Sequence, residues 1–322
     1  MPSEFRPTEP NDGPRLVELA QRLLGVAPES PMFSERHMRW KYWLPASPDD
    51  ASPRGYVLVR DGAIVAHAAA LPLRYHARGR SFTLLHPFDW MSEPSAIGSG
   101  AALLQRLSKL ADGLLIVGGS ETTRRMVRPL GFRGFGDVHM YAAPATPRPS
   151  APPHRVHPIA PDALAGAPPG GPSPWLSAER RAEWLRACLD CPATPMALLS
   201  AGDAARSFGE LVLAFAPGQA RIAAFWPASA RPEERAALLR IARRHAAERS
   251  DTDEVVCMAN APHDRAALED AGFQAVGSVP MFVLAPSSVL SDDDRLGFQM
   301  LDGDLAFLHH GEPWPWLPAR SA

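Results

Sequence analysis

The sequence of 322 residues has little cysteine, no long apolar run and almost no net charge. Its three cysteines are too few for a disulfide framework. No stretch approaches the ~18 apolar residues that a membrane helix needs, and the first residues lack the apolar core of a signal peptide. A formal net charge of −2 disfavours a general nucleic-acid-binding surface. We therefore expect a cytoplasmic protein with no membrane span and no nucleic-acid partner.

Proline, in contrast, is abundant and unevenly placed. The chain holds 35 prolines, and 11 of them fall in residues 144–174. Proline cannot join the interior of a helix or a central strand, so this stretch predicts an extended or wrapping connection. We place a linker at 146–175 between an N-terminal domain, 1–145, and a C-terminal domain, 176–322.

An internal repeat supports this division. Residues 131–143 (GFRGFGDVHMYAA) and 272–284 (GFQAVGSVPMFVL) match at a constant offset of 141 positions. The coinciding pairs are Gly131/Gly272, Phe132/Phe273, Gly136/Gly277, Val138/Val279 and Met140/Met281. A period this long indicates two similar domains, because solenoid repeats are ~20–50 residues long.

Periodicity in the first copy predicts helices followed by strands. Apolar residues at helical spacing predict a helix over 15–24, and Ser34 is a candidate cap for a helix over 34–42. Asp61-Gly62 is a strong hairpin-turn signal. The remaining expected elements are strands over 55–60, 63–72 and 81–90, a helix over 101–110, a strand over 113–118, a helix over 121–129 and a strand over 137–143.

The second copy follows the same plan less completely. Its tail, 287–322, contains two candidate short strands, 297–301 and 305–309. Helices packed against a mixed sheet, an α/β (α+β) class, follow from this order of elements. The other expected elements are helices over 178–189, 232–247 and 264–271, and strands over 210–215, 220–226, 254–258 and 279–285.

The most informative local motif is a strand, a glycine-containing loop and a helix over 88–104. The loop reads SAIGSGA over 95–101. Glycine lets the backbone approach a ligand closely, and the amides at the start of a helix suit a phosphate or pyrophosphate. Two glycines alone are also compatible with a plain strand–helix turn. Both interpretations stay open at this point.

Together, the order of elements and the motifs resemble the GNAT superfamily of acyl-CoA-dependent N-acyltransferases. In that family the third helix begins at a pyrophosphate loop of pattern Gln/Arg-x-x-Gly-x-Gly/Ala, which Ser95-x-x-Gly98-x-Gly100 matches here. The stretch 120–132 (SETTRRMVRPLGF) is similar to the family's fourth helix and Gly-Phe turn. The resemblance implies two tandem GNAT-like domains, each a mixed, mostly antiparallel sheet flanked by helices.

The first copy departs from the family pattern at three positions. Ser95 stands where the family usually has Gln or Arg. Many members carry a Tyr four residues before the glycine of the Gly-Phe turn, where it can protonate the departing thiolate, and Val127 occupies that position here. An Asn often found eleven residues before the same glycine is Ser120.

The second copy departs further. Its stretch 230–239 (ARPEERAALL), which corresponds to the pyrophosphate loop, contains no glycine, and Leu268 occupies the Tyr position. We therefore predict a degenerate second copy that does not bind acyl-CoA in the family's way.

The resemblance implies direct transfer of an acyl group from acetyl-CoA or another acyl-CoA to an amine. The acceptor would be a small molecule or an amino sugar. The paired segments Trp40-Lys41-Tyr42 and Trp184-Leu185-Arg186 also resemble tandem members of this superfamily found in bacterial gene neighbourhoods for surface polysaccharides. Such chemistry needs a base and an acid, and the candidates are Asp89, Glu93 and Ser120, with His86 close behind. The predicted acyl-CoA-binding residues are Trp90, Met91, Ser95, Ile97, Gly98, Ser99, Gly100 and Ala101.

A non-catalytic pseudo-enzyme that binds or scaffolds is the alternative function. Cys188 and Cys191 form a Cys-x-x-Cys pair, which is typical of redox or zinc sites. They close a predicted helix without further ligands nearby, so we expect them to be structural. We predict no metal site, and the oligomeric state stays open.

Overall fold

The computed structural model describes residues 3–44, 54–77, 79–145, 155–164, 175–179, 181–203 and 206–317. They form two compact units. Unit 1 comprises residues 1–135 and 280–294, and unit 2 comprises 136–279 and 295–322. Among the described residues, no helix has the length and apolar character to cross a membrane. Within the same ranges, no cluster of three or more His, Cys, Asp or Glu residues is arranged to hold a metal ion.

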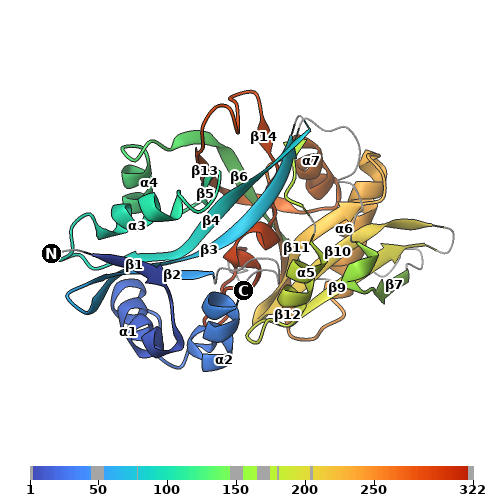
Figure 1. Cartoon of the computed structure of the whole chain (residues 1–322). Helices are drawn as coiled ribbons and strands as arrows, with labels where there is room; N and C mark the ends of the chain where they lie inside the picture. The colour runs from blue at the N-terminus through green and yellow to red at the C-terminus, as the bar shows by residue number, and fades with distance from the viewer. Residues whose placement is uncertain are drawn as a thin grey trace. The chain divides into compact units, whose positions relative to one another are not determined.

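Unit 1 is built on a sheet of six strands, in the order β1-β2-β3-β4-β5-β13 (Figure 1). Only β4 and β5 run parallel, and the other neighbours are antiparallel. The predicted mixed, mostly antiparallel sheet is therefore confirmed. The strands are β1 (Glu4–Pro7), β2 (Gly55–Arg60), β3 (Ala63–Ala77), β4 (Arg80–Ser92), β5 (Gly113–Val117) and the last part of β13 (Gln274–Leu284).

Helices cover both faces of this sheet. Figure 1 shows α1 (Gly13–Leu24) and α2 (Glu35–Met38) on one side, and α3 (Ser99–Leu107) and α4 (Glu121–Val127) on the other. A π-helical turn, η3 (Arg39–Trp43), continues α2. The α3 side encloses a core of alternate β3 residues and the apolar face of α3. That core contains Ala66, Ala68, Ala70, Leu103, Leu104 and Leu107.

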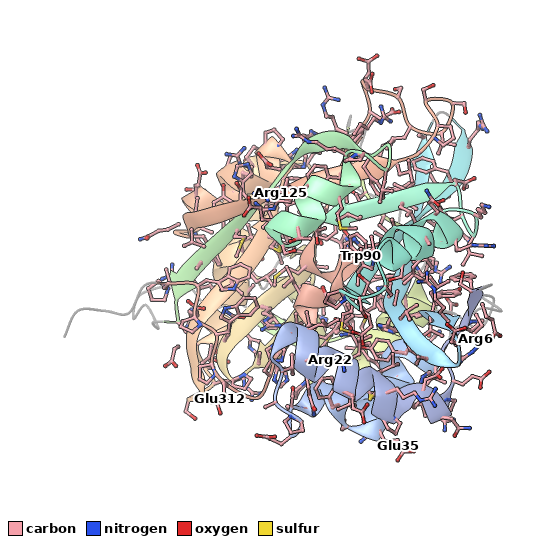
Figure 2. The ribbon with its side chains drawn as sticks, turned by 90° about the vertical axis from the view of Figure 1, so that its left-hand side faces the viewer. Arg6, Arg22, Glu35, Trp90, Arg125 and Glu312 are labelled. Carbon is pink, nitrogen blue, oxygen red and sulfur yellow. The ribbon has the colours of Figure 1, made fainter. Side chains whose placement is uncertain are left out.

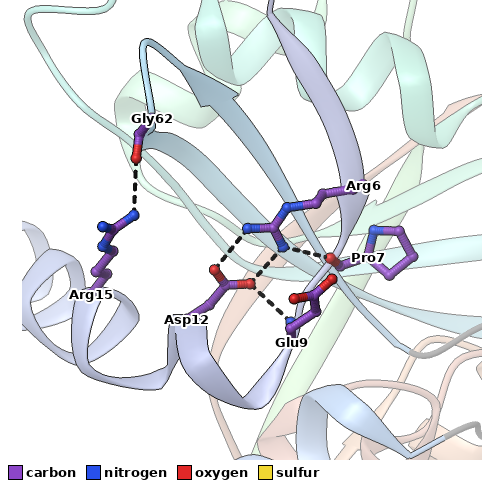
Figure 3. A network of polar contacts seen from close by, with 6 residues as sticks. All are labelled: Arg6, Pro7, Glu9, Asp12, Arg15 and Gly62. Atoms are coloured by element: carbon purple, nitrogen blue, oxygen red, sulfur yellow. Dashed lines mark hydrogen bonds and ion pairs between the residues drawn. The ribbon is translucent and has the colours of Figure 1, made fainter.

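A charged network ties β1 to the start of α1 (Figure 3). The Arg6 guanidinium donates two hydrogen bonds, of 2.7 and 2.8 Å, to the carboxylate of Asp12, which also accepts from the Glu9 amide at 2.8 Å. Arg15 of α1 donates to the Gly62 carbonyl in the β2–β3 turn at 2.9 Å. α1 ends at Gly25, whose left-handed φ of 66° suits the residue that follows a helix.

Unit 2 repeats the plan with the strand order β6-β12-β11-β10-β9-β7. Again a single neighbouring pair, β11 and β12, is parallel. The strands are β6 (Arg133–Pro144, from Gly136 on), β7 (Arg155–Pro158), β9 (Met196–Gly202), β10 (Ser207–Ala216), β11 (Gly218–Pro227) and β12 (Thr252–Ala259). The helices are α5 (Ala182–Leu189), α6 (Pro232–Ala246) and α7 (Pro262–Asp270). Cys188 and Cys191 are buried at the end of α5.

The closing strands of the two repeats are exchanged. In unit 1, Met281–Leu284 of β13 pair with β5, and in unit 2, His139–Pro144 of β6 pair with β12. Phe282 accordingly lies in one core with Phe132, whereas Tyr141 lies in the other core with Phe273. Each unit thus takes its last strand from the other copy of the repeat.

Several elements differ from the prediction. β1, β7 and β9 were not expected, and β7 lies within the predicted linker 146–175, of which residues 146–154 and 165–174 lie outside the described residues. The tail holds no strands at 297–301 and 305–309. Instead it forms 3-10 turns at Met300–Asp302 and Asp304–Ala306 and a short strand, β14 (Arg295–Leu296). The first turn is capped by the Asp302 carboxylate, which accepts from the Gln299 amide at 2.8 Å.

Candidate functional site

The parallel strands β4 and β5 of unit 1 separate where β4 approaches α3. Their pairing is confined to Leu84 with Gly113 and Leu85 with Leu114, although β4 continues to Ser92. Beyond that point His86 bridges the two strands, since its Nδ1 lies 2.9 Å from the Leu115 carbonyl and therefore donates to it. Burial lowers the pKa of His86 to about 4, so the ring is neutral near pH 7.

A β-bulge interrupts β4 shortly after this separation. The register with β3 shifts between His67 and Ala69, so that Asp89 and Trp90 together oppose Ala68. Asp89 has a φ of 47°, a left-handed conformation that costs a non-glycine residue about 1–3 kcal/mol. Bulges bend a strand and re-aim its side chains, and this one lies immediately before the predicted loop.

The bulge directs Trp90 toward the start of α3. The Trp90 indole Nε1 donates to the Gly100 carbonyl at 3.2 Å, and Figure 2 shows Trp90 beside this helix. Gly100 suits this close approach, because a Cβ there would lie 3.0 Å from Ser92 Oγ and 3.2 Å from Trp90 Nε1, and these side chains would have to shift. Strand and helix are therefore held in close contact at the loop.

The loop itself is a compact turn. Glu93 ends the sheet pairing, and its carbonyl accepts from the Ala96 amide at 3.0 Å. The Ala96 carbonyl accepts in turn from the Ser99 amide at 3.0 Å. Gly98 precedes the helix with a φ of 80°, which favours glycine. These bonds turn the chain sharply into α3.

The turn leaves main-chain amides without a hydrogen-bond acceptor in the part of the chain that the structure describes, namely those of Gly98, Gly100 and Ala101. Of these residues Gly98 is exposed, Ala101 is half-buried and Gly100 is buried. Ile97 is 92% exposed, and a Cβ at Gly98 would meet no atom within 4 Å. The first amides of a helix lack acceptors within the helix and carry the positive end of its dipole. A helix start of this kind favours an anion.

The other predicted loop residues have structural contacts of their own. Met91 is buried, Ser95 is exposed, and the Ser99 hydroxyl donates to the Val65 carbonyl at 3.2 Å. Val127, at the position of the expected Tyr, is fully buried in the apolar core. Valine has no acidic hydrogen, so Val127 cannot protonate a thiolate.

Asp89, the first predicted catalytic residue, is buried and paired. Its carboxylate lies 2.5 Å from Lys41 Nζ and accepts from the Tyr42 hydroxyl at 2.7 Å. Burial alone would raise the pKa of Asp89, because it opposes ionisation. The Lys41 charge and the hydrogen bonds from Lys41 and Tyr42 outweigh burial, so the pKa of Asp89 is lowered. A carboxylate so stabilised is a weak base, and whether Asp89 takes a proton stays a prediction.

Glu93 and Ser120 differ from Asp89 in exposure. Glu93 lies at the loop, forms an ion pair with Arg22 of α1, and keeps 22% of its side chain exposed. The Ser120 hydroxyl accepts from the Thr123 amide at 3.2 Å and so caps α4. Glu93 therefore belongs to the loop region, whereas capping of α4 is sufficient to explain a serine at position 120. Their catalytic roles stay predictions.

The residues that hold Asp89 were not predicted as site residues. Lys41, Tyr42 and His67 lie 48, 47 and 22 positions away from it in the sequence, and no motif connects them to it. The available signal was a lysine within the aromatic segment Trp40–Trp43. Such a lysine is unusual in a segment expected to be buried, because lysine is rarely fully buried without a partner.

Unit 2 has a different helix start at the corresponding place. α6 begins with Pro232, followed by Glu233 and Glu234 in its first turn. Glu234 is buried, accepts from Arg206 at 2.5 Å and also accepts from the Ser229 hydroxyl. A carboxylate of the chain therefore occupies the positive end of this helix, where it repels a second anion.

The gap between β11 and β12 in unit 2 is filled by the tail. The pairing of these strands ends at Ile222 and Cys257. Further along β11, the Gln299 side chain accepts from the Phe225 amide at 2.9 Å and donates to the Phe225 carbonyl at 3.1 Å. After the end of β12, Asn260 bonds the Leu296 carbonyl at 2.7 Å. The Gln299 side chain thus bonds the backbone of β11 beyond the end of its pairing with β12.

Comparison with known proteins gives the fold. No family model matches the sequence, and no curated protein matches it. A GCN5-related N-acetyltransferase from Anabaena variabilis superposes with a TM-score of 0.58 at 13% identity, over 88% of this chain and 72% of that one. The chain has the GNAT fold.

Two further structures extend this finding. A tandem GNAT protein from the clavulanic acid biosynthesis pathway is similar with a TM-score of 0.52 at 12% identity, over 88% of this chain and 98% of that one. An N-myristoyltransferase from Saccharomyces cerevisiae, solved with bound myristoyl-CoA, is similar with a TM-score of 0.56 at 9% identity, over 88% and 78%. The predicted tandem arrangement of two GNAT-like domains is thereby confirmed at the level of the fold.

Proposed function

We propose that unit 1 is an acyl-CoA-dependent N-acyltransferase that transfers an acetyl group to an amine of a small molecule or an amino sugar. The observation that carries the proposal is the set of amides of Gly98, Gly100 and Ala101 at the start of α3, which have no hydrogen-bond acceptor among the described residues. Because a helix start favours anions, these amides are placed to bind the diphosphate of coenzyme A.

The separated strands supply the second part of the binding site. Beyond Leu85, β4 is no longer paired with β5, and an unpaired strand edge binds extended chains through main-chain hydrogen bonds. The pantetheine arm of coenzyme A is an extended chain with two amide groups. It would lie along this edge with its thioester directed away from the loop.

The transfer then proceeds by direct attack. The amine nitrogen forms a bond to the thioester carbon, the carbon–sulfur bond breaks, and the thiolate leaves with a proton. Main-chain donors near the bulge would stabilise the negative oxygen. The proposed proton-transfer residues stay Asp89, Glu93 and Ser120, of which Asp89 pairs with Lys41, Glu93 is partly exposed beside Arg22, and Ser120 caps α4.

Thermal unfolding with acetyl-CoA tests the binding step. A ligand at 100 times its Kd adds about 2.7 kcal/mol to the free energy of unfolding, so the melting temperature of unit 1 should rise by several degrees. Gly98→Glu should abolish this rise, because it places a carboxylate among the anion-binding amides.

Gly62→Glu is the matched control. Gly62 has a φ of 75° and, like Gly98, open space where a Cβ would stand, so both substitutions impose the same backbone strain. The control should lower the melting temperature without removing the response to acetyl-CoA. If wild type shows no rise at millimolar acetyl-CoA, the proposal is wrong.

A non-catalytic binding protein with the same fold is the second candidate. The buried Val127 at the position of the expected acid supports it, as does the pairing of Asp89. A protein of this kind would still bind acetyl-CoA but would release no free coenzyme A when amines are added. A thiol assay across a panel of amines and amino sugars separates the two candidates.

A further inference from the structure

A buried ion pair lies directly behind the β4 bulge. The Lys41 side chain is fully buried, and its Nζ lies 2.5 Å from the Asp89 carboxylate, whose side chain is 8% exposed. The Tyr42 hydroxyl donates to the same carboxylate oxygen at 2.7 Å. Both donors come from the π-helical turn that follows α2.

The backbone of Asp89 is held as well. His67 on β3 lies with its Nδ1 3.2 Å from the Asp89 carbonyl, to which the neutral ring donates. The His67 ring packs edge-on against Tyr42, with centroids 4.9 Å apart. Asp89 is therefore fixed at both its side chain and its carbonyl, in a conformation that non-glycine residues avoid.

This conformation decides which β4 side chains face α3. Before the bulge, Leu85 faces the α3 core, while Phe88 lies under Lys41, with Nζ 5.3 Å from its ring centroid. Asp89 also contacts Lys41, so two consecutive residues face the same side. From Trp90 on the alternation is reversed, and Trp90 reaches Gly100. A regular strand would turn Trp90 away from the loop.

We propose that Lys41 and Tyr42 are positioning residues that hold Asp89 in the bulge and so aim Trp90 at the acyl-CoA loop. The inference rests on the proposed function of unit 1 in one respect, namely that the loop before α3 binds acyl-CoA. Stability alone does not account for the pair, because buried ion pairs are often no more stabilising than apolar residues of the same volume. A strained residue, in contrast, persists only where its surroundings hold it.

Two double variants test the proposal in the full-length protein. Lys41→Met/Asp89→Gly and Lys41→Met/Asp89→Ala both remove the two charges together. They differ in that glycine adopts a φ near 47° freely and alanine does not. We expect the glycine variant to keep the bulge although the Lys41–Asp89 pair is gone, and the alanine variant to lose the bulge.

The first readout is amide hydrogen exchange over residues 89–101, which needs no ligand. The alanine variant should exchange about ten-fold faster than the glycine variant, which should stay within about three-fold of wild type. Asp12→Asn, which breaks the Arg6–Asp12 pair of the same unit, is the control for general destabilisation and should leave this segment unchanged. Equal exchange in the two double variants would overturn the proposal.

The second readout is the Kd for coenzyme A by calorimetry. The alanine variant should bind about ten-fold more weakly than the glycine variant, and equal affinities would contradict the inference. If wild type binds no coenzyme A, the proposed function fails, while the exchange result still decides the role of Lys41. Should the alanine variant not fold, Tyr42→Phe replaces it. We then expect faster exchange over residues 89–101, and unchanged exchange would contradict the positioning role of Tyr42.

Discussion

Burial determines what each carboxylate near the β4 loop is able to do. Asp89 and Glu93 are four positions apart, and both are acidic residues at the end of one strand. Asp89 is buried with Lys41 and Tyr42, so its negative charge is used in these contacts at the bulge. Glu93 keeps part of its side chain in contact with solvent beside Arg22.

The sequence was sufficient to locate the loop but not the contacts of Lys41 and Tyr42 with Asp89. Gly98 and Gly100 were predicted from their spacing after a strand, and the structure places them at the start of α3 as expected. The partner of Asp89 could not be predicted, because Lys41 is distant in sequence and only the tertiary fold brings the two together. For the same reason the bulge, which depends on register with β3, left no local signal.

The stability of the protein should fall steeply between pH 6.5 and pH 4. Burial lowers the pKa of His86 to about 4 from an ordinary value of 6.5. In this pH window the His86 imidazole therefore binds a proton in the unfolded chain but not in the folded chain, so lower pH favours unfolding. The lowered pKa corresponds to about 3 kcal/mol for this group.

His86→Asn provides the measurement. The asparagine amide can still donate to the Leu115 carbonyl, but it does not titrate. Denaturant unfolding at several pH values should show the variant losing about 3 kcal/mol less than wild type between pH 6.5 and 4. An identical pH profile for the two proteins would show that His86 accepts a proton in the folded state.

The closing strands show where element prediction from sequence succeeds and where it stops. The repeat identified both strands, because matched glycines and apolar residues recur in order. It could not reveal their exchange, since two similar strands satisfy either partner by pattern alone. The sequence does not predict β1, β7 and β9, because they are edge or near-edge strands without a clean alternation. In the tail it predicts strands in place of the 3-10 turns, because capping by Asp302 has no periodic signal.

Residue size does distinguish the two closing strands. Unit 1 receives Met281-Phe282-Val283-Leu284, and unit 2 receives the smaller Met140-Tyr141-Ala142-Ala143. Tyr141 moreover donates to Glu269 of α7 at 3.0 Å and accepts from Arg265 at 3.3 Å. Each strand is thus fitted to the unit in which it lies.

Two substitutions in the full-length protein test the exchange. Phe282→Ala should cost about 3–5 kcal/mol and should raise amide exchange in β5 and α3 of unit 1. Tyr141→Phe should raise exchange in α7 of unit 2 and leave β5 unchanged, because it removes the contacts with Glu269 and Arg265. The reverse pattern, with Phe282 affecting α7, would show that each repeat keeps its own closing strand.

At the scale of the whole molecule, one fold is present twice with different contents. Unit 1 leaves the amides of its α3 loop unbonded and the β4 edge unpaired. Unit 2 places Glu234 at the start of α6 and the Gln299 side chain on the β11 edge. Unit 2 therefore places its own side chains where unit 1 has the proposed coenzyme site.

Calorimetric titration of the full-length protein with coenzyme A tests this account most directly. We predict one binding site per chain, lost in Gly98→Glu and retained in Gly62→Glu. Two sites per chain would contradict the conclusion that unit 2 is filled by its own residues. No binding, or binding that survives Gly98→Glu, would contradict the assignment of the α3 amides as the diphosphate site.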